Sequence, residues 1–198
     1  MKNFKKIVIT GGPCAGKTTA LEKIRKKFEA DGYTVIIVPE TATELLYGGI
    51  AIDSMETRLF QKTLLELQLH KEACFLKAVE DMNREKIILF FDRGAIDGKA
   101  YMKDEEFLQN LNELNLTEAE LFARYDAVIC LETAANAPGN LYQTENNFVR
   151  FESKEGAIAV DNRLFEVWNN HPNFAFIPAK EDFDEKISFL MKSIEKII

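Results

Sequence analysis

Five short runs of apolar, β-branched or aromatic residues recur along the chain, and each run is nearly continuous. They occupy residues 6–10, 34–38, 86–91, 127–131 and 173–177. Strands that are covered on both faces show this pattern, whereas strands with one face in water alternate apolar and polar positions. The runs therefore predict five buried strands of a parallel sheet.

Helical patterns fill the intervals between these strands. Apolar residues recur at helical spacing in residues 21–28 and 183–198, and residues 55–83 have the apolar positions of one long helix or two in series. Strands that alternate with helices indicate crossover connections, which are right-handed in nearly all known folds. We predict a single three-layer α/β domain over residues 1–198, with a five-stranded parallel sheet in the order 2-3-1-4-5.

One segment departs from the alternation of strands and helices. Residues 133–148 contain four asparagines, Pro138 and Gly139, lack an apolar period, and directly follow the fourth predicted strand. A long loop in a compact domain is usually functional, and the carboxyl ends of strands form the ligand-binding edge of α/β sheets. We therefore predict a lid loop at about residues 133–150.

Composition and charge exclude several classes of protein. The chain is 46% hydrophobic and 29% charged, and its 25 basic and 32 acidic residues give a net charge of −7. This balance disfavours binding to nucleic acid or to an anionic membrane, because both need clustered Lys and Arg. No apolar run approaches the roughly 18 residues of a membrane span. We expect neither a membrane nor a nucleic-acid partner.

The cysteines and the N-terminus indicate the compartment. The three cysteines are widely spaced and form no Cys-x-x-Cys motif, which fits a reducing cytoplasm better than a disulfide framework or a zinc site. The apolar stretch at residues 7–9 is too short for a signal peptide. The sequence predicts a cytoplasmic protein and leaves its oligomeric state open.

Residues 11–18 read Gly-Gly-Pro-Cys-Ala-Gly-Lys-Thr and match the G-x-x-x-x-G-K-[ST] phosphate-loop (Walker A) motif between a predicted strand and a predicted helix. Glycines let the backbone amides surround an anion, Lys17 can reach the β- and γ-phosphates, and the Thr18 hydroxyl can bind Mg²⁺. We predict a site for a nucleoside triphosphate, either ATP or GTP. Its predicted binding residues are Gly11, Gly12, Pro13, Cys14, Ala15, Gly16, Lys17, Thr18 and Thr19.

Charged residues follow the other predicted strands at their carboxyl ends. Glu40 comes just after the second strand, Asp92 and Arg93 end the third, and Arg150 lies at the far end of the predicted lid loop. Kinases of small metabolites need such carboxylates near the acceptor hydroxyl and arginines beside the transferring phosphoryl group. Asp92 is placed to hold Mg²⁺ together with Thr18. Lys17, Glu40, Asp92, Arg93 and Arg150 are therefore the candidate catalytic residues.

Two other classes of phosphate-loop protein fit less well. Arg93 stands where ring ATPases and helicases carry a glutamate that activates water, and the chain has no room for a separate helical lid domain. Ras-like GTPases read guanine with Asn-Lys-x-Asp, and that tetrapeptide does not occur in the sequence.

The order of these motifs resembles the deoxynucleoside kinase and nicotinamide riboside kinase group of phosphate-loop proteins. The likeness includes AAA-type ATPase-like relatives and covers most of the chain. It rests on the phosphate loop, Pro39-Glu40 after the second strand, Asp92-Arg93 after the third, and Arg150 in the lid. The resemblance implies that Glu40 is the base toward the acceptor hydroxyl, Asp92 a magnesium ligand and Arg93 an acceptor-site arginine.

Some assignments have a purely structural alternative. Glu40 also suits the N-terminus of a helix over 41–47, where acidic residues favour the helix dipole. Arg93 also suits an ion pair with Asp97 or Glu40. Gln61 and Gln68 lie on one helix face, either lining an acceptor pocket or facing water.

The favoured function is Mg²⁺-dependent transfer of the γ-phosphoryl group of ATP to a hydroxyl of a nucleoside-like metabolite. The alternative is a regulatory module that binds ATP or GTP with little or no phosphotransfer. The two differ at the acceptor side. A kinase needs an open pocket lined by Glu40, Arg93 and the Gln61 face, whereas apolar side chains would fill this space in a regulator.

Overall fold

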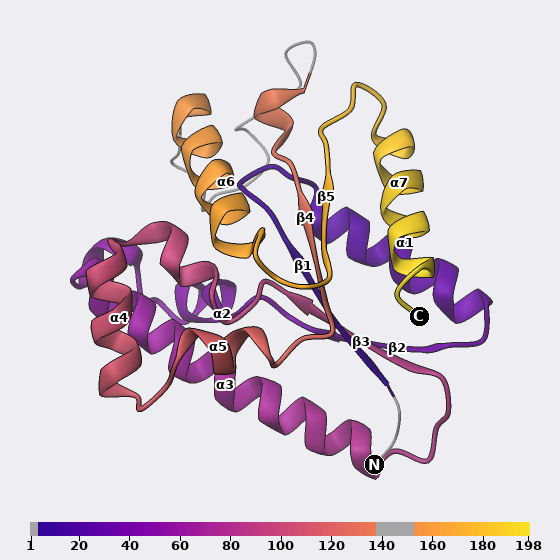
Figure 1. Cartoon of the computed structure of the whole chain (residues 1–198), viewed down its shortest axis with the longest axis horizontal. Helices are drawn as coiled ribbons and strands as arrows, with labels where there is room; N and C mark the ends of the chain where they lie inside the picture. The colour runs from indigo at the N-terminus through magenta and orange to yellow at the C-terminus, as the bar shows by residue number, and fades with distance from the viewer. Residues whose placement is uncertain (1–3, 138–152) are drawn as a thin grey trace.

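Five parallel strands form the centre of the computed structural model, which describes residues 4–137 and 153–198 (Figure 1). The strands are, in chain order, β1 (Lys5–Thr10), β2 (Thr34–Val38), β3 (Ile87–Asp92), β4 (Ala127–Leu131) and β5 (Phe174–Ile177). They pair in the order β2-β3-β1-β4-β5, and every pairing is parallel. The predicted sheet, including its strand order, is confirmed.

Helices connect the strands throughout the described residues. The α-helices there are α1 (Lys17–Ala30), α2 (Thr41–Tyr47), α3 (Thr57–Asp81), α4 (Asp104–Glu113), α5 (Glu118–Phe122), α6 (Lys154–Trp168) and α7 (Phe183–Glu195). Short 3₁₀ segments are η1 (Ile52–Ser54), η2 (Asp97–Tyr101) and η3 (Ala134–Asn136). The long apolar segment forms one helix, α3. In these parts of the chain, no helix has the length and apolar character needed to cross a membrane.

The sheet is covered on both faces. Figure 1 shows α1 and α7 on one side of the strands and α3, α5 and α6 on the other. Ile7 and Ile9 of β1 pack into the core beneath α1 and α7, whereas Val8 between them joins the core that holds Trp168 of α6. Adjacent side chains of one strand therefore enter two separate cores. This double burial explains why the strand sequences are continuously apolar.

The strand register places the ends of β1, β2 and β3 at one edge of the sheet. Ile9 pairs with Asp92, and Val38 pairs with Phe91. The segments that begin at Gly11, Glu40 and Arg93 therefore leave the sheet close to one another.

Candidate functional site

The loop between β1 and α1 needs its two motif glycines for steric reasons. Gly11 has φ +141° and Gly16 has φ +84°, a conformation that other residues adopt only with strain. A Cβ atom at Gly11 would stand 2.1 Å from the Leu131 carbonyl oxygen, and one at Gly16 would stand 2.6 Å from the Phe183 ring. The motif glycines let β4 and α7 pack directly against this loop.

Each carbonyl oxygen from Gly11 to Ala15 accepts a hydrogen bond from within the protein. The pairs are Lys17 Nζ with Gly11 O (2.9 Å) and Gly12 O (3.3 Å), Thr133 Oγ1 with Pro13 O (2.5 Å), Ala134 N with Cys14 O (3.3 Å), and Lys186 Nζ with Ala15 O (2.9 Å). The carbonyl oxygens of the loop are therefore satisfied by donors from α1, from α7, from η3 and from Thr133, which precedes η3.

The N–H groups of residues 16–19, at the start of α1, donate to no acceptor within 4–137 and 153–198. The first amides of a helix have no partner inside the helix, and they carry the positive end of its dipole. Such amides bind phosphate groups readily. The backbone at residues 16–19 can therefore hold an anion.

Lys17 is a buried cation at this helix start. Only 8% of its surface is exposed. Burial, reinforced by the nearby charge of Arg93, lowers the pKa of Lys17 to about 8, although Glu40 and Asp92 oppose the shift. A triphosphate beside the ammonium would offset this loss of solvation.

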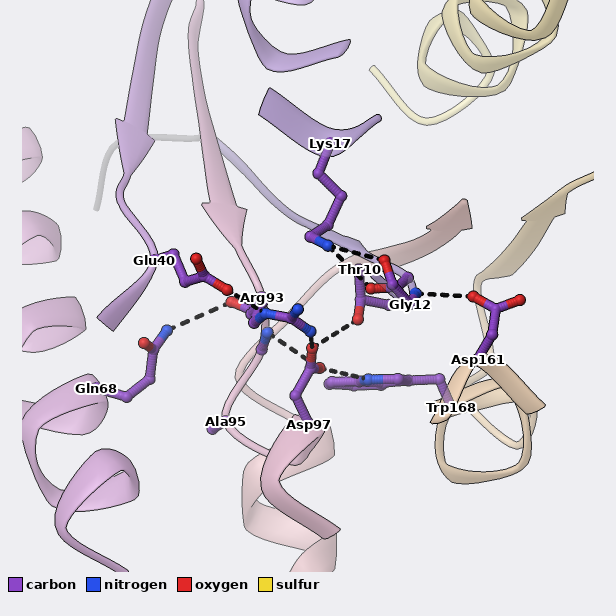
Figure 2. A network of polar contacts seen from close by, with 12 residues as sticks. Thr10, Gly12, Lys17, Glu40, Gln68, Arg93, Ala95, Asp97, Asp161 and Trp168 are labelled. Atoms are coloured by element: carbon purple, nitrogen blue, oxygen red, sulfur yellow. Dashed lines mark hydrogen bonds and ion pairs between the residues drawn. The ribbon is translucent and has the colours of Figure 1, made fainter. Parts of the chain in front are cut away.

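Glu40 lies at the N-terminus of α2 and forms an ion pair with Arg93 (Figure 2). Its second carboxylate oxygen accepts a hydrogen bond of 2.7 Å from the Thr43 hydroxyl. Burial would raise the pKa of Glu40, but the charges of Arg93 and Lys17 and these hydrogen bonds outweigh it and lower the pKa to about 2. Glu40 is therefore ionised at neutral pH.

Arg93 has an unusual backbone for a residue with a side chain. Its φ of +73° lies in the left-handed region, and its N–H donates to Ile9 O at 3.1 Å. Non-glycine residues in this region cluster at functional sites, where the surrounding structure holds the strain. The conformation turns the chain sharply after β3 and brings the guanidinium to Glu40.

The Asp97 carboxylate links several segments around the site through hydrogen bonds. It is 4% exposed, and one oxygen accepts from Thr10 Oγ1 at 2.6 Å and from Arg93 at 3.4 Å. The other accepts from Gly94 N at 3.2 Å and from the Trp168 indole at 2.8 Å (Figure 2). A carboxylate with four donors positions its neighbours, and it has little capacity left to serve as a base.

Asp92 has a different environment. Its Oδ1 is the only buried side-chain polar atom in the described residues that lacks a hydrogen-bond partner. Burial raises the pKa of Asp92 above its usual range, against the opposing charge of Lys17. Because an orphaned carboxylate oxygen beside a phosphate-binding loop is suited to a cation, Asp92 and the Thr18 hydroxyl fit a Mg²⁺ site.

One pocket of about 820 Å³ unites these groups. The start of α1 contributes Lys17 and Thr18 to the wall of this pocket, and Glu40, Asp92 and Arg93 line the same space. The two predicted glutamines, together with Asp97 and Tyr101, also line it. The structure thus brings the predicted site residues together, except for Arg150 and most of the predicted lid loop, which lie outside the described residues.

The two glutamines differ in their availability. The Gln68 amide accepts from Thr41 Oγ1 and donates to Glu72 at 2.8 Å, so it holds α2 and α3 together. Gln61 makes no hydrogen bond within the portion of the chain that the structure describes. Only Gln61 therefore has an amide free to contact a ligand.

Two buried charged residues that contact the loop were not predicted from the sequence. Asp161 of α6 is 2% exposed and accepts from Gly12 N at 2.7 Å. Lys186 of α7 is held between Ala15 O and Glu132 O, and burial lowers its pKa to about 8. Neither residue belongs to a motif. The one available signal is a charged residue within an otherwise apolar helix face.

The contact from Asp161 can be tested directly. Asp161→Ala leaves the buried Gly12 N–H without an acceptor, and we expect a loss of about 1–3 kcal/mol in the free energy of unfolding. Asp161→Asn keeps an acceptor oxygen and should lose less. Urea denaturation measures both, with Asn162→Ala, at an exposed position of the same helix, as the control. Equal stability of Asp161→Ala and wild type would contradict the assignment.

Fold and motif together define a P-loop NTPase fold. A family model described as an AAA domain (AAA_28) matches residues 6–186. The chain therefore belongs to this AAA domain family. None of the curated proteins compared with the chain matches its sequence.

Solved structures show the same architecture at low sequence identity. A NadR protein in complex with NR is similar with a TM-score of 0.69 and 16% identity, covering 98% of this chain and 51% of the NadR chain. A thymidylate kinase from Candida albicans gives a TM-score of 0.61 and 17% identity, covering 97% of this chain and 91% of the kinase. The chain spans about half the length of the NadR protein. At these identities the likeness establishes the fold.

Proposed function

We propose that this protein is an ATP-dependent kinase that phosphorylates a hydroxyl group of a small, nucleoside-like metabolite. The observation that carries the proposal is the open pocket of about 820 Å³ in which Lys17 and Thr18 face the same space as Glu40, Asp92 and Arg93. The names of both structural neighbours, a NadR protein bound to NR and a thymidylate kinase, support it. GTP is the alternative phosphoryl donor.

The reaction joins the acceptor to the γ-phosphoryl group. A bond forms between the acceptor oxygen and the γ-phosphorus while the bond to the bridging β,γ-oxygen breaks, and ADP leaves. Lys17 and the amides of residues 16–19 hold the phosphates. Glu40 orients the acceptor hydroxyl and receives its proton, and Arg93 steadies the carboxylate through their ion pair. Arg150, from the predicted lid loop, is the proposed closing contact to the phosphates.

Thr18 and Asp92 are the proposed Mg²⁺ ligands. The described residues contain no cluster of three or more His, Cys, Asp or Glu side chains suited to a metal. This agrees with the usual mode of Mg²⁺ binding, in which one or two protein ligands act together with substrate phosphates and water. When bound, Mg²⁺ would neutralise charge on the phosphate oxygens.

Removing either ligand should affect only the metal-dependent part of ATP binding. We expect Thr18→Ala and Asp92→Asn to reduce ATP affinity in Mg²⁺ by at least about tenfold, since even partners behind a metal ligand are typically worth this much. Affinity measured in EDTA should stay near the wild-type value. Isothermal titration in both conditions decides the matter. A loss of equal size in EDTA would show that these side chains contact the nucleotide itself.

A second candidate function is also supported by specific observations. The low pKa of Glu40 makes it a weak base, and its ion pair with Arg93 occupies both groups. These features also suit a nucleotide-binding regulator with little or no phosphotransfer. The open acceptor side of the pocket favours the kinase.

The two functions are separated by the fate of the γ-phosphoryl group. The protein is incubated with γ-labelled ATP, Mg²⁺ and a mixture of nucleosides and hydroxylated vitamins, and the products are separated by chromatography. Label in an organic product supports the kinase. Label that stays in ATP or appears only as inorganic phosphate contradicts it.

A further inference from the structure

Glu72 of α3 is a buried carboxylate that takes no part in the reaction proposed above. Only 1% of its surface is exposed, and it does not line the pocket. Its Oε1 accepts hydrogen bonds from the Tyr125 hydroxyl at 2.7 Å and from Gln68 Nε2 at 2.8 Å. Its Oε2 accepts from Arg124 Nε at 2.8 Å, and the two side chains form an ion pair. A buried charge is tolerated when it is paired and hydrogen-bonded, and Glu72 meets both conditions.

The turn after β3 is held by both donors to Glu72 Oε1. The Tyr125 hydroxyl, which donates to Glu72, accepts from Ala95 N at 2.8 Å. Gln68 Nε2 also donates to the Arg93 carbonyl oxygen at 3.4 Å (Figure 2). Arg93 has the left-handed backbone described above, and such strain persists only where the surroundings hold the chain. Glu72 therefore orients two groups that hold this turn, one near each of its ends.

The same carboxylate is connected to the start of α2. Gln68 Oε1 accepts from the Thr41 hydroxyl, and Thr41 is 4% exposed and directly follows Glu40. Because Gln68 Nε2 donates to Glu72, the amide is fixed with its oxygen toward Thr41. A buried polar network whose members are all satisfied is rigid. The backbone that carries Glu40 and the backbone that carries Arg93 are therefore both tied to Glu72.

We infer that Glu72 is a positioning residue for the ion pair of Glu40 with Arg93. It acts through the two side chains that donate to its Oε1. The expected effect on the rate rests on the proposed kinase function, whereas the effect on the backbone does not. Misplacement of a reacting group by about 1 Å can cost about 10²-fold in rate. The phosphate loop is held by other donors, so ATP affinity should stay near the wild-type value.

The first test needs no substrate. Hydrogen–deuterium exchange is measured by mass spectrometry on the ligand-free protein, in peptides that cover residues 93–97 and 39–48. In Glu72→Gln one end of the new amide is a donor, so part of the network loses its acceptor, and exchange should rise about tenfold in both peptides. Tyr125→Phe removes only the connection to the turn and should raise exchange in 93–97 alone.

The control for exchange is Val79→Ala. Val79 lies two turns along the same face of α3, is 1% exposed and belongs to the apolar core, so its truncation lowers stability without touching the network. It should not raise exchange in the two peptides selectively. Unchanged exchange at 93–97 in Glu72→Gln overturns the inference. If Glu72→Gln does not fold, Tyr125→Phe and Gln68→Met decide instead, and unchanged exchange at 93–97 in both overturns it.

The second test measures chemistry. Transfer of label from γ-labelled ATP is followed with Mg²⁺ and the mixture of nucleosides and hydroxylated vitamins. Glu72→Gln should slow transfer about 10- to 100-fold, while isothermal titration shows ATP affinity near wild type. Val79→Ala should leave both near wild type. An equal loss of ATP affinity and rate in Glu72→Gln overturns the inference, because it indicates general damage to the fold.

A double-mutant cycle separates positioning from an independent effect. In a Glu40→Gln background the pair is already broken, so adding Glu72→Gln should change the rate by less than about twofold. Losses that multiply in the double variant overturn the inference. If no member of the mixture takes up label even with the wild-type protein, the proposed function fails, and hydrogen exchange still decides whether Glu72 holds the two segments.

Discussion

Replacing Lys17 by alanine is expected to lower the affinity for ATP by about 10- to 150-fold while the fold is retained. Hydrogen bonds to charged groups are worth about 1.5–3 kcal/mol, and about 1.4 kcal/mol corresponds to a tenfold change in affinity. We expect the fold to be retained because burial disfavours the charged form of Lys17, as its lowered pKa indicates. The substitution removes this buried charge. Isothermal titration measures the loss. Lys26→Ala, at an exposed position of the same helix, is the matched control.

The same lysine should make ATP binding dependent on pH. In the unliganded protein the pKa of Lys17 is about 8, so the side chain is charged below this pH and increasingly neutral above it. Bound phosphates favour the charged form, so binding above pH 8 takes up a proton and affinity falls as the pH rises. Titration at pH 7 and pH 9 tests this dependence, which should disappear in Lys17→Ala. Unchanged affinity in Lys17→Ala would remove the basis of the phosphate site.

Glu40→Gln is expected to slow phosphotransfer by about 10²- to 10⁴-fold, the usual contribution of a general base, with ATP affinity nearly unchanged. The amide keeps the shape of the carboxylate but cannot accept the proton. The variant also removes the ion pair with Arg93. Single-turnover rates with an identified acceptor, together with ATP titration, separate chemistry from binding.

The control for this variant lies on the same helix. Glu44→Gln removes an exposed carboxylate of α2 that pairs with Lys71, and it should leave the rate near wild type. If Glu40 serves only the helix N-terminus, its substitution would cost roughly 0.3–1 kcal/mol of stability and no rate. Full phosphotransfer by Glu40→Gln would exclude it as the base. The four donors to Asp97 make that residue a poor substitute.

The sheet could be predicted because each strand is buried on both faces. Continuous apolar runs, with helical periods between them, leave few alternatives to a parallel sheet with crossover helices. The exact ends of the strands were harder to predict from the sequence. Lys86 was expected in the third strand, yet it lies outside β3 with φ +51°, and Asn173 likewise precedes β5. Such ends depend on local backbone geometry that apolar character does not encode.

The placement of the candidate site residues was predictable where these residues lie in short segments at strand ends. The phosphate loop, Glu40 and Asp92-Arg93 all lie at or just beyond the carboxyl ends of strands, so topology alone places them at one edge of the sheet. The supports of the loop were not predictable. Asp161 lies 149 residues from Gly12, and Lys186 lies 171 residues from Ala15. Contacts over such separations arise from packing, and no spacing in the sequence reveals them.

The hydrogen bonds to the carbonyl oxygens of residues 11–15 have a consequence for the thermodynamics of binding. Ordering one residue of a flexible chain costs about 1–2 kcal/mol in conformational entropy. The carbonyl oxygens of this loop already accept hydrogen bonds from Lys17, Thr133, Ala134 and Lys186, so the loop is ordered before a ligand binds. The entropy cost of ordering it therefore belongs to folding and not to binding. An arriving triphosphate then loses little affinity to loop ordering, and its amide contacts count almost fully toward the free energy of association.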